Sequence, residues 1–125
     1  MLKVLRRFEP YAYALLRIVA GLVFLFHGLQ KFGIMGGGMV PMFSLMGLAA
    51  IIEGVGGALI MVGFMTAPIA FLASGEMAYA YFTAHQPKGT WPIQNGGELA
   101  ALFAFLFLYI STRGAGVLSV DGGGK

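Results

Sequence analysis

The chain has 125 residues, of which 58% are hydrophobic and only 10% are charged, whereas ordinary soluble domains carry about 25% charged residues. So few charges cannot cover a small soluble fold, and the net charge of +3 comes largely from the first seven residues, which favours a membrane protein over a nucleic-acid-binding one. The sequence contains no cysteine, which excludes disulfides, thiolate metal sites and iron–sulfur clusters carried by this chain.

Four apolar stretches follow one another along the chain, each near the length of about 20 helical residues that a bilayer requires. They cover residues 11–29, 42–64, 66–84 and 97–112. Strands are disfavoured because these runs lack period-two alternation and are rich in Ala, Leu and Met. The sequence therefore predicts an all-α fold, a transmembrane four-helix bundle, with residues 1–125 forming a single domain.

Basic residues predict the orientation of these spans. The first span is preceded by Lys3, Arg6 and Arg7, and the last span is followed by Arg113 and Lys125. The loops on the opposite side of the membrane offer only Lys31 and Lys88. By the positive-inside rule, both termini are expected in the cytoplasm. A cleaved signal peptide is the competing interpretation, but the first apolar stretch is too long and contains Arg17.

Small residues recur at helix-contact spacing in the second and third spans, at Ala50, Gly54 and Ala58 and at Ala70, Ser74 and Ala78. Such rows let helix backbones approach closely in a membrane. The turn between these two spans is short, so we expect them to be antiparallel neighbours.

Ionisable residues inside the apolar stretches are the most informative feature, because a central charge costs at least about 2.5 kcal/mol. They are Arg17, Glu53 and Glu76, with His27, Lys31, His85 and Glu98 near the span ends. On the first span, one helical face carries Arg17, Gly21, Phe24, Gly28 and Lys31. We expect this face to point inward, so that the ionisable groups converge in the outer half of the bundle.

Two interpretations of this cluster remain open. The charges are structural ion pairs between helices, with Arg17 paired to a glutamate, or they line a polar cavity that receives a ligand or relays protons. Haem ligation by His27 and His85 is possible in principle, but histidines facing water are the commoner case. No metal site is expected.

Five short motifs carry a family resemblance. They are His27-Gly28-x-x-Lys31, Glu53-Gly54-x-Gly56-Gly57, Glu76-Met77-Ala78, Asn95-Gly96-Gly97-Glu98 and Gly114-Ala115-Gly116-x-x-Ser119-x-Asp121. Each motif is weak alone, but in this order on four helices they resemble the DoxX family of small four-helix bacterial membrane proteins, over nearly the whole chain. The family's matching charged positions are Arg17, His27, Lys31, Glu53, Glu76 and Glu98.

The resemblance implies a place in the bacterial cytoplasmic (inner) membrane and a link to quinone chemistry. Members are small subunits of thiosulfate:quinone oxidoreductases or belong to membrane complexes that handle thiols and oxidative stress. Because this chain has no cysteine, direct thiol–disulfide exchange is not expected of it.

The leading hypothesis is a quinone-interacting or accessory subunit of a membrane oxidoreductase system with a soluble or membrane redox partner. His27 and Lys31 would contact the quinone carbonyls, and Glu53, Glu76 and Glu98 would handle protons. One alternative is a small-solute or proton transporter acting as a homo-oligomer, and another is a non-catalytic scaffold for redox enzymes. These hypotheses leave open whether the chain is itself an enzyme.

Overall fold

A computed structural model describes residues 1–34 and 38–122, and the elements in this part of the chain are all helical. Lys125, one of the basic residues counted above, lies outside the described residues. The elements are α1 (Leu2–Arg6), α2 (Glu9–Lys31), α3 (Leu45–Val62), α4 (Thr66–Ala80), the π-helix η1 (Tyr81–His85), the short 3₁₀-helix η2 (Gln86–Lys88), α5 (Pro92–Asn95) and α6 (Glu98–Arg113).

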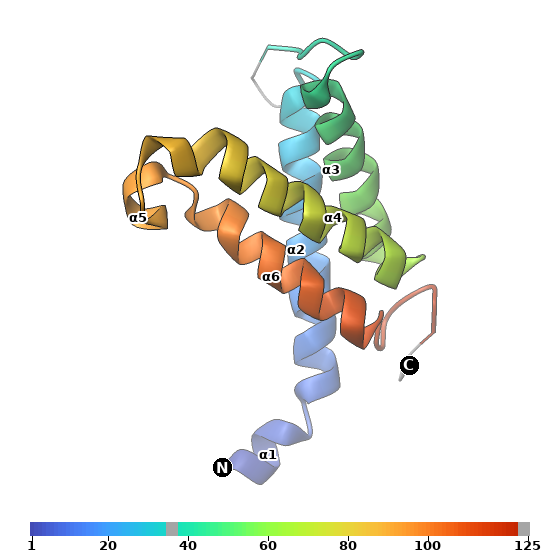
Figure 1. The fold of residues 1–125 in the computed structure, drawn as a ribbon. Coiled ribbons are helices and arrows are strands. Elements are labelled where there is room, and N and C mark those ends of the chain that lie inside the picture. Colours follow the sequence, from blue (N-terminus) through green and yellow to red (C-terminus); the bar gives the residue numbers. More distant parts are fainter. Residues whose placement is uncertain (35–37, 123–125) are drawn as a thin grey trace.

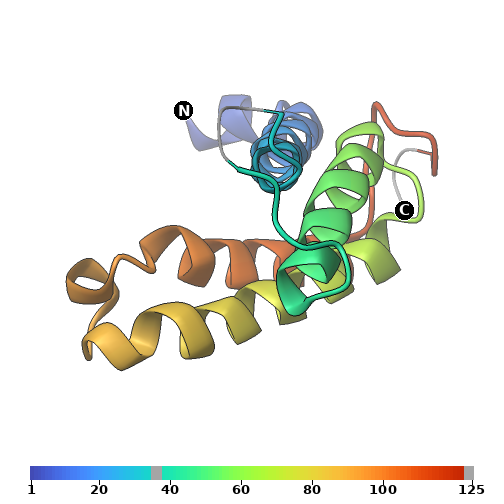
Figure 2. The ribbon, with the colours of Figure 1, turned by 90° about the horizontal axis from the view of Figure 1, so that it is seen from above.

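The four long helices coincide with the four predicted apolar stretches, but they do not form one aligned bundle. They form two antiparallel hairpins, α2–α3 and α4–α6, and the second hairpin crosses the first obliquely (Figure 1). From above, α2 is seen almost end-on while α4 and α6 run side by side across the view (Figure 2). Helices α3 and α4 contact each other as expected, although each packs more extensively within its own hairpin.

Glycines bring α2 and α3 into close contact. A Cβ atom on Gly28 would collide with the backbone of Gly54, and one on Gly57 would collide with the backbone of Leu25. Close backbone approach of this kind is a common way for apolar helices to associate in a membrane. The face of α2 predicted to point inward does so, since Arg17, Gly21, Phe24 and Gly28 are buried.

Aromatic rings hold the two hairpins together. Phe24 of α2 lies against Phe103 and Phe107 of α6, with ring centroids 5.8 Å and 4.8 Å apart. Within the second hairpin, the hydroxyl of Ser74 donates a hydrogen bond of 2.6 Å to the carbonyl oxygen of Ala104. These contacts form a core at the crossing point of the hairpins.

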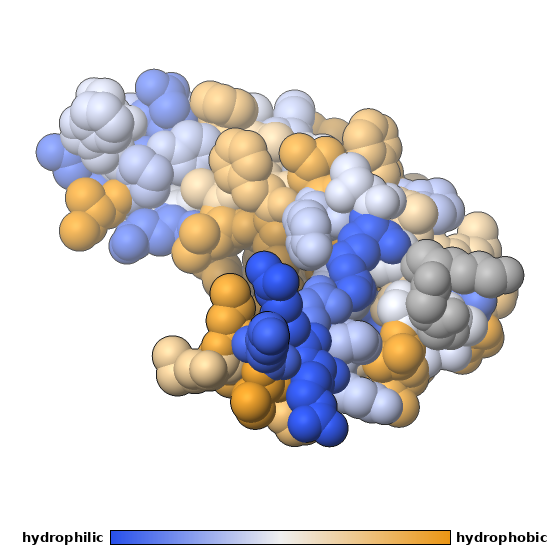
Figure 3. All heavy atoms as spheres, turned by 90° about the horizontal axis from the view of Figure 1, so that it is seen from below, coloured by the Kyte–Doolittle hydropathy of each residue, from blue (hydrophilic) through white to orange (hydrophobic). Residues whose placement is uncertain are grey.

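The exterior of the described helices is apolar. Helices α2 and α3 are each long and apolar enough to cross a membrane. Large apolar side chains are also exposed on the second hairpin, including Phe71 and Leu72 of α4 and Leu102 and Phe105 of α6. At the N-terminal end, seen from below, hydrophilic side chains gather beside apolar ones (Figure 3), and α1 there carries Lys3 and Arg6.

Candidate functional site

Arg17 is fully buried, but it binds backbone rather than a carboxylate. Its guanidinium group donates to the carbonyl oxygens of Ile60 (3.0 Å) and Leu118 (2.6 Å), and further to those of Met61, Ala115 and Val117. Within the described residues, no carboxylate lies within ion-pair distance of it, which differs from the ion pair expected from the sequence. Arg17 therefore fastens the C-terminal segment to α3. It lies fourteen residues before Lys31 on α2, away from the ionisable groups at the other end of that helix.

The C-terminal motif supplies the other half of this fastening. Beyond the carbonyl groups that Arg17 binds, the carboxylate of Asp121 accepts hydrogen bonds of 3.0 Å from the backbone amides of Met65 and Thr66, at the start of α4. The hydrogen bond from Thr66, with that from Met65, holds the pKa of the Asp121 carboxyl below its ordinary value of 3.8. The motif thus closes the turn between α3 and α4.

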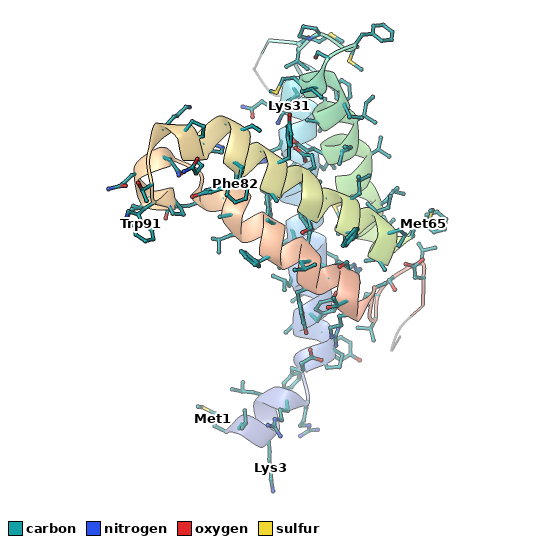
Figure 4. All side chains as sticks on the ribbon, viewed as in Figure 1. Met1, Lys3, Lys31, Met65, Phe82 and Trp91 are labelled. Atoms are coloured by element: carbon teal, nitrogen blue, oxygen red, sulfur yellow. The ribbon has the colours of Figure 1, made fainter. Side chains whose placement is uncertain are left out.

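A cavity of about 380 Å³ lies at the other end of α2, where the two hairpins meet. Its strongest polar contact is an ion pair in which the ammonium group of Lys31 donates to Oε1 of Glu53 at 2.7 Å. The Glu53 side chain is only 2% exposed, whereas that of Lys31 is 21% exposed. Figure 4 shows Lys31 at the upper end of α2.

Glu76 of α4 also lines the cavity, beside this ion pair. Its carboxyl group neighbours that of Glu53, and its Oε1 atom is buried with no hydrogen-bond partner among the described residues. Buried polar atoms are almost always partnered, and those that are not are found where a ligand, a proton or water completes the site. Glu76 therefore gives the cavity an unused hydrogen-bonding group.

Two histidines complete the polar part of the lining. Nδ1 of His27 lies 2.9 Å from the carbonyl oxygen of Val23, which can only accept, so Nδ1 carries the hydrogen and Nε2 is left for a ligand. Nδ1 of His85 lies 3.4 Å from the carbonyl oxygen of Asn95. The π-helix η1, whose last residue is His85, extends α4 as far as the cavity.

Asn95, the first residue of the fourth family motif, was not predicted to have a role at the site, but it supports the cavity from outside its lining. It is 5% exposed, its amide nitrogen donates to the hydroxyl of Tyr81 and the carbonyl oxygen of Gly89, each at 3.1 Å, and its Oδ1 accepts from the amide of Gly97. These bonds fix the turn between η1 and α6 beside His85. The signal available in the sequence was an asparagine followed by two glycines, which is typical of a turn.

Glu98 does not reach the cavity. It is exposed at the first turn of α6, where a carboxylate suits the positive end of the helix dipole. The structure thus brings together His27, Lys31, Glu53 and Glu76, and with them His85, but leaves Arg17 and Glu98 outside. The predicted convergence of all the ionisable groups was too broad.

The remaining walls of the cavity are apolar, and they close it toward Arg17. Phe24, Met77 and Phe103 line it. Phe24 and Phe107, both 0% exposed, fill the core between the cavity and Arg17. The polar lining of the cavity and the contacts of Arg17 are therefore separated by packed apolar side chains.

Comparison with known proteins gives one family and one relative of nearly equal length. The family model described as DoxX matches residues 12–86, which contain every polar residue of the cavity. An uncharacterized protein of Haemophilus influenzae is 42% identical over 125 residues, covering 94% of this chain and 93% of the relative. No solved structure matches the chain.

Proposed function

The chain belongs to the DoxX family of membrane proteins, and we propose that the cavity between its two hairpins binds the head group of a quinone for a membrane oxidoreductase system. The observation that carries this proposal is the chemistry of the cavity lining. An ion pair, an unpartnered carboxyl oxygen and two imidazoles surround a space that is otherwise apolar and aromatic. Sites for small organic ligands combine apolar walls with a few polar groups in this way, and 380 Å³ lies in their usual size range of about 300–1,000 Å³.

Each polar group has a defined part in this proposal. The Lys31 ammonium group has three donors, of which Glu53 takes one, so it can also donate to a quinone carbonyl. Nε2 of His27 accepts a hydrogen bond when the ring is neutral and donates one when the ring is protonated, so His27 can hold a proton beside the second carbonyl. Phe24 and Phe103, both buried, form the apolar end wall of the cavity.

The neighbouring carboxyl groups of Glu53 and Glu76 are suited to proton exchange. The two carboxyl groups lie beside each other, and the Lys31 ammonium group that binds Glu53 compensates one negative charge. Reduction of a quinone by a redox partner takes up electrons and protons. In our proposal the chain supplies the protons through Glu76 and His27, and a partner subunit supplies the electrons.

This arrangement supports a binding site better than a transport path. A path for solutes or protons needs polar groups that continue across the molecule, whereas Phe24 and Phe107 pack between the cavity and Arg17. A scaffold without catalytic chemistry would need no ligand in the cavity, so the ligand-retention experiment below distinguishes it from a quinone-binding subunit.

For the membrane arrangement we propose four spans with both termini in the cytoplasm of the bacterial inner membrane. Helices α2 and α3 satisfy the length and hydropathy requirements, and α4 continues through η1 to His85. The apolar side chains exposed on α4 and α6 support lipid contact for the second hairpin as well. The basic residues of α1, Lys3 and Arg6, support a cytoplasmic N-terminus.

The test is quinone retention after extraction and purification in native lipid. Wild-type protein is expected to retain quinone, and the double variant Glu53→Gln, Glu76→Gln is expected to lose most of it. Glu98→Gln is the matched control, because it makes the same change in an exposed residue outside the cavity. Equal occupancy in all three proteins would contradict the proposed site. Loss of stability in the double variant without any quinone in the wild type would favour the scaffold.

A further inference from the structure

A second hollow, an open and mostly apolar groove of about 450 Å³, lies on the surface of the molecule between α3 and α4. Leu45, Leu48 and Ile52 line it from α3, and Phe71, Leu72, Gly75 and Tyr79 line it from α4. Its apolar side chains are largely exposed, so in a membrane this groove faces the lipid tails.

The groove adjoins the cavity of the proposed quinone site. Both hollows are lined by Ala49 of α3 and Glu76 of α4, so these two residues form the boundary between them. Across this boundary the lining changes from mostly apolar in the groove to polar in the cavity. The buried Oε1 of Glu76, which has no hydrogen-bond partner among the described residues, lies at the boundary. A molecule with a polar head group and a long apolar chain fits these two hollows, with its head group in the cavity and its chain in the groove.

We infer that the groove between α3 and α4 is the lateral opening through which an isoprenoid or alkyl quinone reaches the cavity from the bilayer, and that it holds the apolar chain of the bound quinone. This inference rests on the proposed function. It identifies the ligand as a lipid-soluble, long-chain quinone rather than a water-soluble one. Glu76 stands where head and chain join, so that protons and ligand meet at the same residue.

Gly75 allows the groove to be closed without disturbing the packing. A Cβ atom at Gly75 would meet no heavy atom within 4 Å, so a larger side chain extends into the groove and not into the helix interface. On the opposite wall, Leu48 is 54% exposed and offers an independent position for the same purpose. Gly75→Ala is the matched control, since a methyl group leaves the groove open.

The experiment compares two ligands that share one benzoquinone ring, one bearing a decyl chain and the other a methyl group. Binding to protein in lipid nanodiscs is measured by calorimetry for the wild type, Gly75→Phe, Leu48→Trp and Gly75→Ala. Partition of the decyl quinone into the lipid is common to all four proteins and cancels in the comparison. We expect Gly75→Phe and Leu48→Trp to weaken decyl-quinone binding by at least about tenfold, with methyl-quinone binding changed by less than about twofold. Gly75→Ala is expected to match the wild type.

The possible failures are distinguishable. If Gly75→Phe and Leu48→Trp bind both quinones as the wild type does, the chain of the ligand lies elsewhere and the groove holds ordinary lipid, while the proposed head-group site stands. An equal loss for both quinones also contradicts the inference, because it assigns the effect to the head-group site. If the wild type binds neither quinone, the proposed function fails and the inference with it.

Discussion

Lys31 and Glu53 form an ion pair of 2.7 Å between α2 and α3, and this pair is placed next to a third ionisable group, Glu76, that has an unpartnered buried oxygen among the described residues. The pair lies one residue from the tightest helix contact, because Glu53 adjoins Gly54, which packs on Gly28. A cavity that was only a packing defect would have apolar walls. Here five ionisable side chains line it, namely His27, Lys31, Glu53, Glu76 and His85.

Breaking the ion pair from the lysine side leaves the Glu53 carboxylate buried without its cation. We predict that Lys31→Met lowers the free energy of unfolding by about 3 kcal/mol. The double variant Lys31→Met, Glu53→Gln should lose less than the sum of the two single variants. Unfolding of the detergent-solubilised protein by denaturant checks this. A Lys31→Met variant as stable as the exposed control Glu98→Gln would show that the pair contributes nothing to folding.

Arg17→Lys keeps the charge but cannot reach five carbonyl oxygens, because a lysine ammonium has three donors on one nitrogen. Carbonyl groups that lose their donors cost about 1–3 kcal/mol each when buried, so we predict a stability loss of about 2–4 kcal/mol. The C-terminal segment should also detach more readily. Trypsin cleavage after Arg113 in detergent-solubilised protein should therefore be faster than in the wild type, and an unchanged cleavage rate would argue against this fastening.

The carboxylate of Asp121 predicts a specific pH dependence. Its pKa in the folded chain is lowered by the hydrogen bonds from Thr66 and Met65, so its contribution to stability is complete above the ordinary value of 3.8 and is lost as the pH falls through the folded value. The melting temperature of wild type should exceed that of Asp121→Ala at neutral pH, and the difference should shrink below about pH 4. A difference that stays constant from pH 7 to pH 3 would contradict this role.

Two glycine substitutions should have opposite effects. Gly28→Ala puts a methyl group into the backbone of Gly54, so it should separate α2 from α3 and lower the melting temperature despite the better helix propensity of alanine. Gly75→Ala puts the same group into open space and should stabilise α4 by up to about 1 kcal/mol. Thermal unfolding of both variants in the same detergent checks the pair, and similar shifts for both would contradict the packing.

Helix positions and the inward face of α2 were predictable because they follow from local patterns. Apolar run length gave the four long helices, and helical spacing gave the buried face that includes Gly21 and Phe24. The crossing of the two hairpins was not predictable in this way. It depends on side-chain packing between helices far apart in the sequence, such as Phe24 against Phe107.

Only part of the candidate site was predictable, because the sequence shows which residues are costly to bury but not which residues they contact. Burial cost identified Glu53, Glu76 and Lys31, but it cannot say which partner satisfies a buried charge. Arg17 binds backbone carbonyl oxygens of the C-terminal segment, and a sequence gives no sign of such acceptors, since every residue has one. Glu98 is a glutamate like Glu53 and Glu76 of the cavity, but it lies in the exposed first turn of α6.

The most direct test of the quinone site is a density map of the protein extracted with its native lipid. Our account predicts density for a ring among His27, Lys31 and Glu53, with an apolar chain continuing past Glu76 toward Gly75. Lys31, Glu53 and Glu76 in mutual contact with no space and no density between them would contradict it, and would identify these residues as fasteners of the two hairpins.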